Sequence, residues 1–127
     1  TNDTRESPAI EICLNLLEEG AILSIHDPKV EAAQIENDFR DKNVHESSNW
    51  SYSSTIEETI KDSHAVVILT EWAIYKHLNW LELEKLMLKP AWVFNTRTVL
   101  NVENIEKTNI NYWRVGNKVN KKYYGNL

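Results

Sequence analysis

Glycine is scarce in this sequence. The 127 residues contain three glycines, Gly20, Gly116 and Gly125, and no two of them lie close together. Loops that cradle the phosphates of a nucleotide need closely spaced glycines, because the backbone must approach the phosphates. The sequence therefore excludes a glycine-rich phosphate loop within this chain, and any nucleotide contact must use other groups.

Cysteine is scarcer still, and long apolar runs are absent. The single cysteine, Cys13, excludes an internal disulfide and a multi-cysteine zinc site. It falls in an apolar helical pattern, which favours a buried, unreactive thiol. The four histidines show no metal-ligand spacing, so we predict no metal site. No stretch approaches the ~20 apolar residues of a membrane span and no signal-peptide pattern is visible, so we expect a cytoplasmic protein without a membrane partner.

Acidic and basic residues are unevenly distributed. Residues 1–62 carry 14 acids and 5 bases, a net charge of −9, whereas residues 63–127 carry 5 acids and 9 bases, a net charge of +4. The final bases are Arg114, Lys118, Lys121 and Lys122. Four charges without interleaved aromatic platforms are a weak nucleic-acid signal, so we expect a solvated basic tail and no nucleic-acid partner.

Short strands alternate with helices along the chain. The apolar spacing and the capping residues predict helices over 8–19, 31–42, 55–61 and 80–88, and a short one ending near Ile105. Short apolar runs predict strands at 21–26, 50–53, 65–69, 91–94 and 112–115. This alternation predicts one α/β domain, a doubly wound and mostly parallel sheet with helices on both faces.

Two arginines are expected at the edge of this sheet where ligands bind, outside the carboxyl ends of parallel strands. Arg97 directly follows the strand at 91–94, and Arg5 precedes the first helix, whose free N–H groups favour anions. A guanidinium at either place could bind a phosphate or carboxylate through paired hydrogen bonds. An ion pair with a nearby acid is the alternative for each arginine, and the residues alone leave it open. Catalytic machinery is not visible in this sequence.

Four stretches, taken together, resemble one known family. They are NDTRESPAIEI (2–12), LLEEGAILSIHDPKV (16–30), SHAVVILTEWAIYKHLNW (63–80) and KPAWVFNTRTVL (89–100). In order and spacing they resemble the C-terminal, UDP-binding domain of the nucleotide-sugar dehydrogenases. The resemblance implies a Rossmann-like fold, and a family strand ending in Phe-Lys that precedes Thr1 and is missing from this sequence.

The resemblance also implies a function for a larger protein. Enzymes of this family oxidise the C6 alcohol of a nucleotide sugar to a carboxylate by two hydride transfers to NAD. Their glycine-rich NAD domain and their cysteine nucleophile lie outside the stretch resembled here, and Cys13 does not match that cysteine. We therefore expect residues 1–127 to be the UDP-binding fragment of such an enzyme, inactive alone. The expected ligand is UDP-glucose or a related nucleotide sugar, and the full-length protein is expected to be a homo-oligomer.

Two residues match functional positions of the family. Arg5 matches an arginine that reaches the NAD phosphate, and Arg97 matches an arginine that contacts the UDP-sugar. Around Arg97 this sequence departs from the family, because Asn95-Thr96 replaces Asp-Gly and Thr98 replaces a basic residue. These changes remove a carboxylate and a flexible residue beside the arginine, and so could alter contacts with the substrate.

Other functions fit the sequence less well. A related dehydrogenase acting on another UDP-sugar or on GDP-mannose would share these motifs. A receiver-type signalling domain has a similar order of elements, and Thr70 fits it, but Lys89-Pro90 comes before its strand rather than after it. A non-catalytic interaction module exposing Trp50, Trp72 and Trp113 is the remaining alternative.

Overall fold

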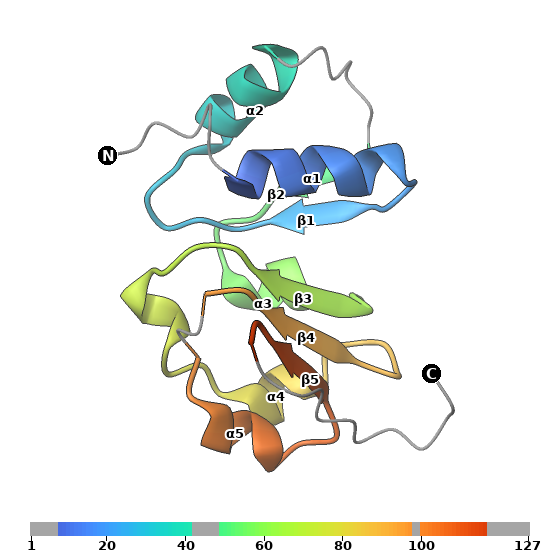
Figure 1. The fold of residues 1–127 in the computed structure, drawn as a ribbon, viewed down its shortest axis with the longest axis vertical. Coiled ribbons are helices and arrows are strands. Elements are labelled where there is room, and N and C mark those ends of the chain that lie inside the picture. The colour runs from blue at the N-terminus through green and yellow to red at the C-terminus, as the bar shows by residue number, and fades with distance from the viewer. Residues whose placement is uncertain (1–7, 42–48, 98–99, 117–127) are drawn as a thin grey trace. The chain divides into compact units, whose positions relative to one another are not determined.

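The computed structural model describes residues 8–41, 49–97 and 100–116. Helices and strands alternate along the chain, which divides into two compact units, Thr1–Thr59 and Ile60–Leu127 (Figure 1). No helix among the described residues has the length and apolar character needed to cross a bilayer. That one domain spans 1–127 stays a prediction.

The first unit contains two helices and a pair of parallel strands. Its elements are α1 (Pro8–Glu18), β1 (Leu23–Ile25), α2 (Ala32–Asp41) and β2 (Trp50–Tyr52). β1 pairs with β2 in register, Leu23 opposite Trp50 and Ile25 opposite Tyr52. The first helix ends as its sequence predicts, because Gly20 adopts a φ of +93° and its N–H bonds to the carbonyl of Leu17.

The core of this unit joins both helices to the strands. Ile10 of α1, Val30, and Ile35 and Phe39 of α2 form its buried centre. Trp50 packs edge-on against Phe39, with ring centroids 5.0 Å apart and an interplanar angle of 89°. Edge-to-face packing of this kind is favourable beyond the apolar area that it buries.

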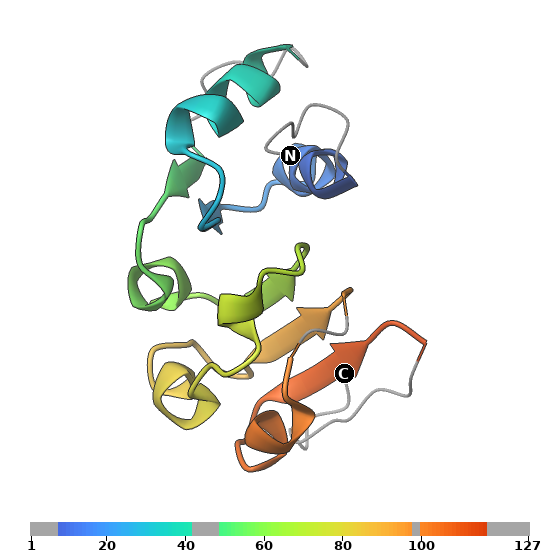
Figure 2. The same cartoon turned by 90° about the vertical axis from the view of Figure 1, so that its left-hand side faces the viewer.

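The second unit is a three-stranded parallel sheet with short helices. Its strands are β3 (Ala65–Ile68), β4 (Trp92–Asn95) and β5 (Asn111–Arg114), in the order β3-β4-β5. The connections contain the 3-10 helix η1 (Ala73–Tyr75) and the helices α4 (Trp80–Glu84) and α5 (Val102–Glu106). α4 and α5 lie together on one face of this sheet (Figure 2). The division between the units falls within α3 (Ile56–Ile60).

The buried residues of the second unit come from the sheet and from its helices. Val93 and Ile110 are fully buried, and Trp80 and Ile105 are 1% exposed. Trp92 and Phe94 flank the buried Val93 along β4, so their side chains lie on the other face of the sheet from Val93. There the two rings stack, with centroids 5.4 Å apart. β3 is buried only in part, because Ile68 is 6% exposed whereas Val67 is 37% exposed, so its apolar run is not covered on both faces within the described residues.

The α/β class and the parallel pairing that the sequence predicts are confirmed, and both are consistent with a Rossmann-like fold. The described strands form two sheets, of two and three strands. One helix is shorter than its pattern predicts: α4 ends at Glu84 instead of continuing to residue 88. There the N–H of Leu88 bonds to the carbonyl of Ser63, so the chain leaves the helix to meet the segment before β3.

Candidate functional site

The carboxyl ends of β3, β4 and β5 meet at one edge of the second unit. Ile68, Asn95 and Arg114 are the last residues of the three strands and stand in register across the sheet. The segments that follow them therefore leave the sheet side by side. In open parallel sheets this edge is where ligands bind, so it is the candidate site.

Arg97 lies at this edge, as the sequence predicts. It is half-buried, and its Nε donates a hydrogen bond of 3.1 Å to the carbonyl oxygen of Leu69. Its backbone N–H donates to Oδ1 of Asn95 at 3.1 Å. The side chain and the backbone of Arg97 are thus tied to the ends of two neighbouring strands. The bond through Nε holds the guanidinium at the end of β3, and a guanidinium can pair with an anion through parallel N–H groups.

Thr96 strengthens the same turn. Its hydroxyl donates to the carbonyl oxygen of Ile68 at 2.6 Å, and its backbone N–H contacts the same oxygen at 3.3 Å. Thr96 stands where the resembled family has a flexible glycine. This replacement could alter the surroundings of Arg97. The structure shows that the threonine adds a link between the end of β4 and the end of β3.

Asn95 is the other departure, and it is a buried polar residue. Its side chain has no exposed surface, and its Nδ2 donates a hydrogen bond of 3.0 Å to the hydroxyl of Tyr112 on β5. Together with the bond from Arg97 to its Oδ1, this uses both ends of the amide. A buried amide is tolerated when it is hydrogen-bonded in this way.

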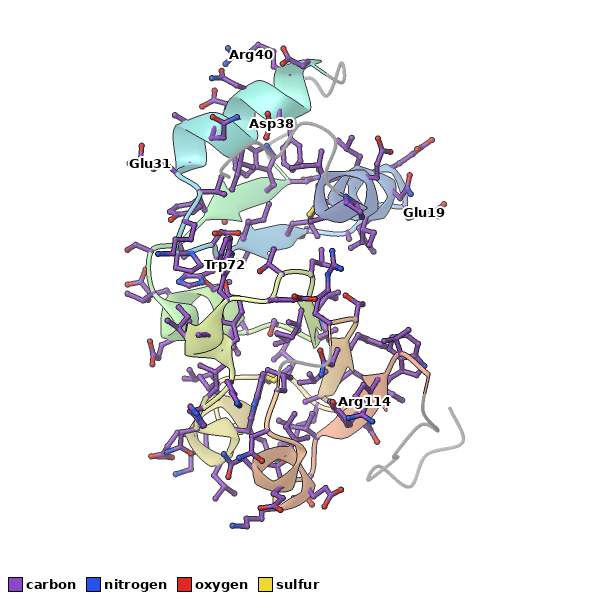
Figure 3. All side chains as sticks on the ribbon, turned by 60° about the vertical axis from the view of Figure 1, so that its left-hand side comes forward. Glu19, Glu31, Asp38, Arg40, Trp72 and Arg114 are labelled. Atoms are coloured by element: carbon purple, nitrogen blue, oxygen red, sulfur yellow. The ribbon has the colours of Figure 1, made fainter. Side chains whose placement is uncertain are left out.

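A second arginine at this edge was not foreseen as a site residue. The sequence pattern groups Arg114 with a solvated basic tail, but the structure places it as the last residue of β5, half-buried and opposite Asn95 (Figure 3). The signal was available, because Arg114 lies within the predicted strand 112–115 and a strand's carboxyl end is part of the binding edge. Two arginines, Arg97 and Arg114, thus lie at this edge.

The other residues singled out from the sequence lie in different settings. Thr70 and Trp72 follow β3 and are half-buried, and the carbonyl of Trp72 accepts the first hydrogen bond of η1, from Tyr75. Trp72 is labelled in Figure 3. Arg5 and Thr98 lie outside the described residues, so the expectation that Arg5 binds the cofactor stays a prediction.

In the first unit, the end of β1 forms a tight polar turn. Asp27 accepts hydrogen bonds from the backbone N–H groups of Lys29 and Val30, at 2.8 and 3.1 Å, so it caps the turn at Pro28. Burial lowers the pKa of the neighbouring His26 below its ordinary value. The charge of Asp27, a hydrogen bond with the backbone of Ser54 and the charge of Glu57 act in the opposite direction.

Nucleophilic and metal chemistry find little support in the described residues. Burial raises the pKa of the Cys13 thiol to about 11, so almost no thiolate forms near neutral pH. Among residues 8–41, 49–97 and 100–116 no three histidine, cysteine or carboxylate side chains gather closely enough to hold a metal ion.

Comparison with known proteins gives a consistent picture. Residues 1–102 match the UDP-binding domain of the UDP-glucose/GDP-mannose dehydrogenase family. A UDP-glucose 6-dehydrogenase from Pongo abelii is 41% identical over an alignment 128 positions long, which covers 96% of this chain and 26% of that protein. The enzyme of the same name from Drosophila melanogaster is 37% identical over 123 aligned positions, and UDP-glucose 6-dehydrogenase 4 from Arabidopsis thaliana is 32% identical over 133 aligned positions.

These relatives are much longer than the chain. The match covers 93% of this chain but 26% of the Drosophila protein, and 91% of this chain but 27% of the Arabidopsis protein. The chain thus spans about a quarter of the length of the curated relatives that it matches. The family match covers most of the sequence and includes both Arg5 and Arg97. The chain belongs to the UDP-glucose/GDP-mannose dehydrogenase family, of which it carries the UDP-binding domain.

Proposed function

We propose that the carboxyl edge of β3, β4 and β5 binds the diphosphate of UDP-glucose, with Arg97 as the principal contact. The observation that carries this is the attachment of Arg97 to the ends of two strands, through Leu69 and Asn95. A guanidinium held in this way loses little conformational freedom when it pairs with phosphate oxygens. Arg114 adds a second positive charge at the same edge.

The domain belongs, in this proposal, to an NAD-dependent UDP-glucose 6-dehydrogenase that converts UDP-glucose to UDP-glucuronate. The names of the relatives and their fourfold greater length support this. Residues 1–127 are then a fragment that binds substrate and is inactive alone. The nucleophile would come from elsewhere in the protein, since the thiol of Cys13 is held protonated.

NAD does not fit the described residues of this chain. Gly20 ends α1 and Gly116 follows β5, so neither belongs to a glycine-rich loop. We infer that NAD binds mainly to a separate domain of the full-length protein, with Arg5 reaching its phosphate. The full-length protein is proposed to be a cytoplasmic homo-oligomer, as the family resemblance implies.

The test is the affinity of the full-length protein for UDP and UDP-glucose, measured by isothermal titration calorimetry. Arg97→Ala should lose about 1.5–3 kcal/mol of binding free energy, the usual contribution of a charge-assisted hydrogen bond. Lys107→Ala is the matched control. It removes the same charge from the end of α5 and should leave the affinity unchanged. An unchanged affinity in Arg97→Ala would refute the proposal.

A second candidate is a related enzyme that acts on GDP-mannose, which the family description includes. The diphosphate contact proposed for Arg97 does not distinguish uridine from guanosine. Titration of the full-length protein with UDP-glucose, other UDP-sugars and GDP-mannose separates these possibilities, because only the true substrate should bind tightly and reduce NAD.

A further inference from the structure

The interior of the sheet contains an amide directly behind the proposed binding residue. Asn95 is fully buried at the end of the central strand β4, between β3 and β5. Burying an amide costs free energy unless hydrogen bonds replace those to water. An apolar side chain would satisfy this position at lower cost, so the amide has a use beyond packing.

The two ends of this amide join two different structures. Nδ2 is anchored to the hydroxyl of Tyr112 on β5, and Oδ1 receives the backbone N–H of Arg97. Rotation of the Asn95 side chain would break both hydrogen bonds. The anchor therefore fixes Oδ1, and Oδ1 fixes the direction in which the chain turns after β4.

The turn sets where the arginine side chain begins. From this position the Nε of Arg97 reaches the carbonyl oxygen of Leu69, which lies beyond the end of β3. The hydrogen bonds form one series, from Tyr112 through Asn95 and Arg97 to Leu69, that crosses all three strands. Arg97 is the member of this series that would contact a ligand. Tyr112, Asn95 and Leu69 can hold it in place without contacting the ligand themselves.

We propose that Asn95, held by Tyr112, is a positioning residue that orients Arg97 toward the phosphates of the nucleotide sugar. This rests on the proposed function. What the position requires is an acceptor oxygen facing the N–H of Arg97. A carboxylate would meet this requirement, because the phenol of Tyr112 can donate as well as accept. Leucine, of nearly the same size, would not.

Calorimetric titration of the full-length protein with UDP tests this requirement. Asn95→Leu should weaken binding about tenfold, which corresponds to the loss of a well-placed charged contact. Asn95→Asp should stay within about threefold of the unmodified protein, since the acceptor is kept. Tyr112→Phe removes only the anchor and should give an intermediate loss of about threefold. Equal binding by Asn95→Leu and Asn95→Asp would overturn the proposal.

A double-mutant cycle separates positioning from a general loss of stability. If Asn95 acts through Arg97, then Asn95→Leu should weaken UDP binding no further in an Arg97→Ala background. Equal effects of Asn95→Leu in both backgrounds would overturn the proposal. The proposed function fails separately, if Arg97→Ala by itself does not weaken UDP binding.

Thr108→Val provides the matched structural control. Thr108 is also buried, and its hydroxyl donates to the carbonyl of Ile105 at 2.6 Å, but it precedes β5 at the opposite end of the strand. This variant should lower the melting temperature and leave the UDP affinity unchanged. If Asn95→Leu does not fold, Tyr112→Phe replaces it in the double-mutant cycle with Arg97→Ala. The effect of Tyr112→Phe on UDP affinity must then vanish in the Arg97→Ala background.

Discussion

The Nε of Arg97 donates a hydrogen bond of 3.1 Å to the carbonyl oxygen of Leu69, so an arginine that follows β4 is fastened to the chain that follows β3. Residues at the ends of two adjacent parallel strands thus hold one charged side chain in place. The position of the Arg97 side chain depends on Leu69, which lies 28 residues earlier in the chain. Substitutions at the end of β3 should therefore affect ligand binding, as should substitutions beside Arg97.

Removing the hydroxyl of Thr96 should loosen this edge. Thr96→Val keeps the shape of the side chain but loses the 2.6 Å bond to the carbonyl of Ile68, at a cost of about 0.5–1.5 kcal/mol. Hydrogen exchange measured by mass spectrometry should become faster in peptides covering the ends of β3 and β4. Thr59→Val is the control, because the hydroxyl of Thr59 makes a local hydrogen bond, to the carbonyl oxygen of Thr55 four residues earlier. Equal exchange rates at the sheet edge in both variants would contradict the role of Thr96.

Removing the second charge of the edge should weaken nucleotide binding less than removing the first. Arg114→Ala should cost about 0.5–1.5 kcal/mol of UDP binding free energy, and the loss should shrink as salt is added because screening weakens longer-range attraction. Calorimetry at low and high salt measures both effects. Lys107→Ala carries the same change of net charge, so an equal loss in that variant would mean that Arg114 has no local role.

The aromatic pair in the first unit should be a major source of its stability. Phe39 is 2% exposed and packs edge-on against Trp50. Phe39→Ala should cost about 3–5 kcal/mol through lost apolar contacts and the cavity left behind. Pulse proteolysis in urea, followed with peptides from α1 and α2, reports the loss. Phe39→Leu retains most of the volume and should cost clearly less. Similar losses in the two variants would argue against a tightly packed site.

The thiol of Cys13 should react slowly with iodoacetamide while the protein is folded. Its pKa is raised from 9.0 to about 11, so near pH 8 the thiolate fraction falls about hundredfold, and alkylation slows accordingly. Mass spectrometry of the labelled peptide gives the rate. Rapid labelling at the rate of an unfolded control would show that the partial burial of Cys13 does not suppress its thiolate.

The same shift makes stability depend on pH. The folded state holds the thiol proton more tightly than the unfolded state, so Cys13 favours folding below about pH 9 and this advantage is lost as the pH rises toward about 11. Urea midpoints for local proteolysis should therefore fall over this window, and Cys13→Ala should reduce the fall. Parallel curves for the two proteins would rule out this contribution.

Local signals in the sequence predict the elements well where the residues that begin or end them are explicit. Pro8 begins α1 and Gly20 ends it, and Asn79 caps α4 by accepting the N–H of Glu82. The early end of α4 was not predictable from periodicity, because the bond from Leu88 to Ser63 joins segments that are distant in sequence. The division of the strands into two sheets was not predictable for the same reason. Which strands pair depends on contacts between distant segments and is not encoded in either strand alone.

The candidate site was predictable in part. Arg97 follows an obvious buried strand, so the rule for carboxyl ends identifies it. Arg114 was missed because it is the first of the four final bases, in a segment without acids, and the charge pattern of the tail outweighed the strand pattern. The role of Asn95 could not be read from sequence, because it depends on Tyr112, which lies 17 residues away on another strand.

The common end of the three strands has a consequence for how this domain can change over generations. The three paired strands end together at Ile68, Asn95 and Arg114, and the segments that follow them leave the sheet at the edge where ligands are expected to bind. Substitutions that retune ligand preference can therefore accumulate in the following segments without disturbing the interior. Asn95 is the exception, since it is both interior and edge. A change there that removes the amide also removes the hydrogen bond to Tyr112, so the two positions are expected to evolve as a pair except where aspartate, which the phenol can serve as a donor, replaces the asparagine.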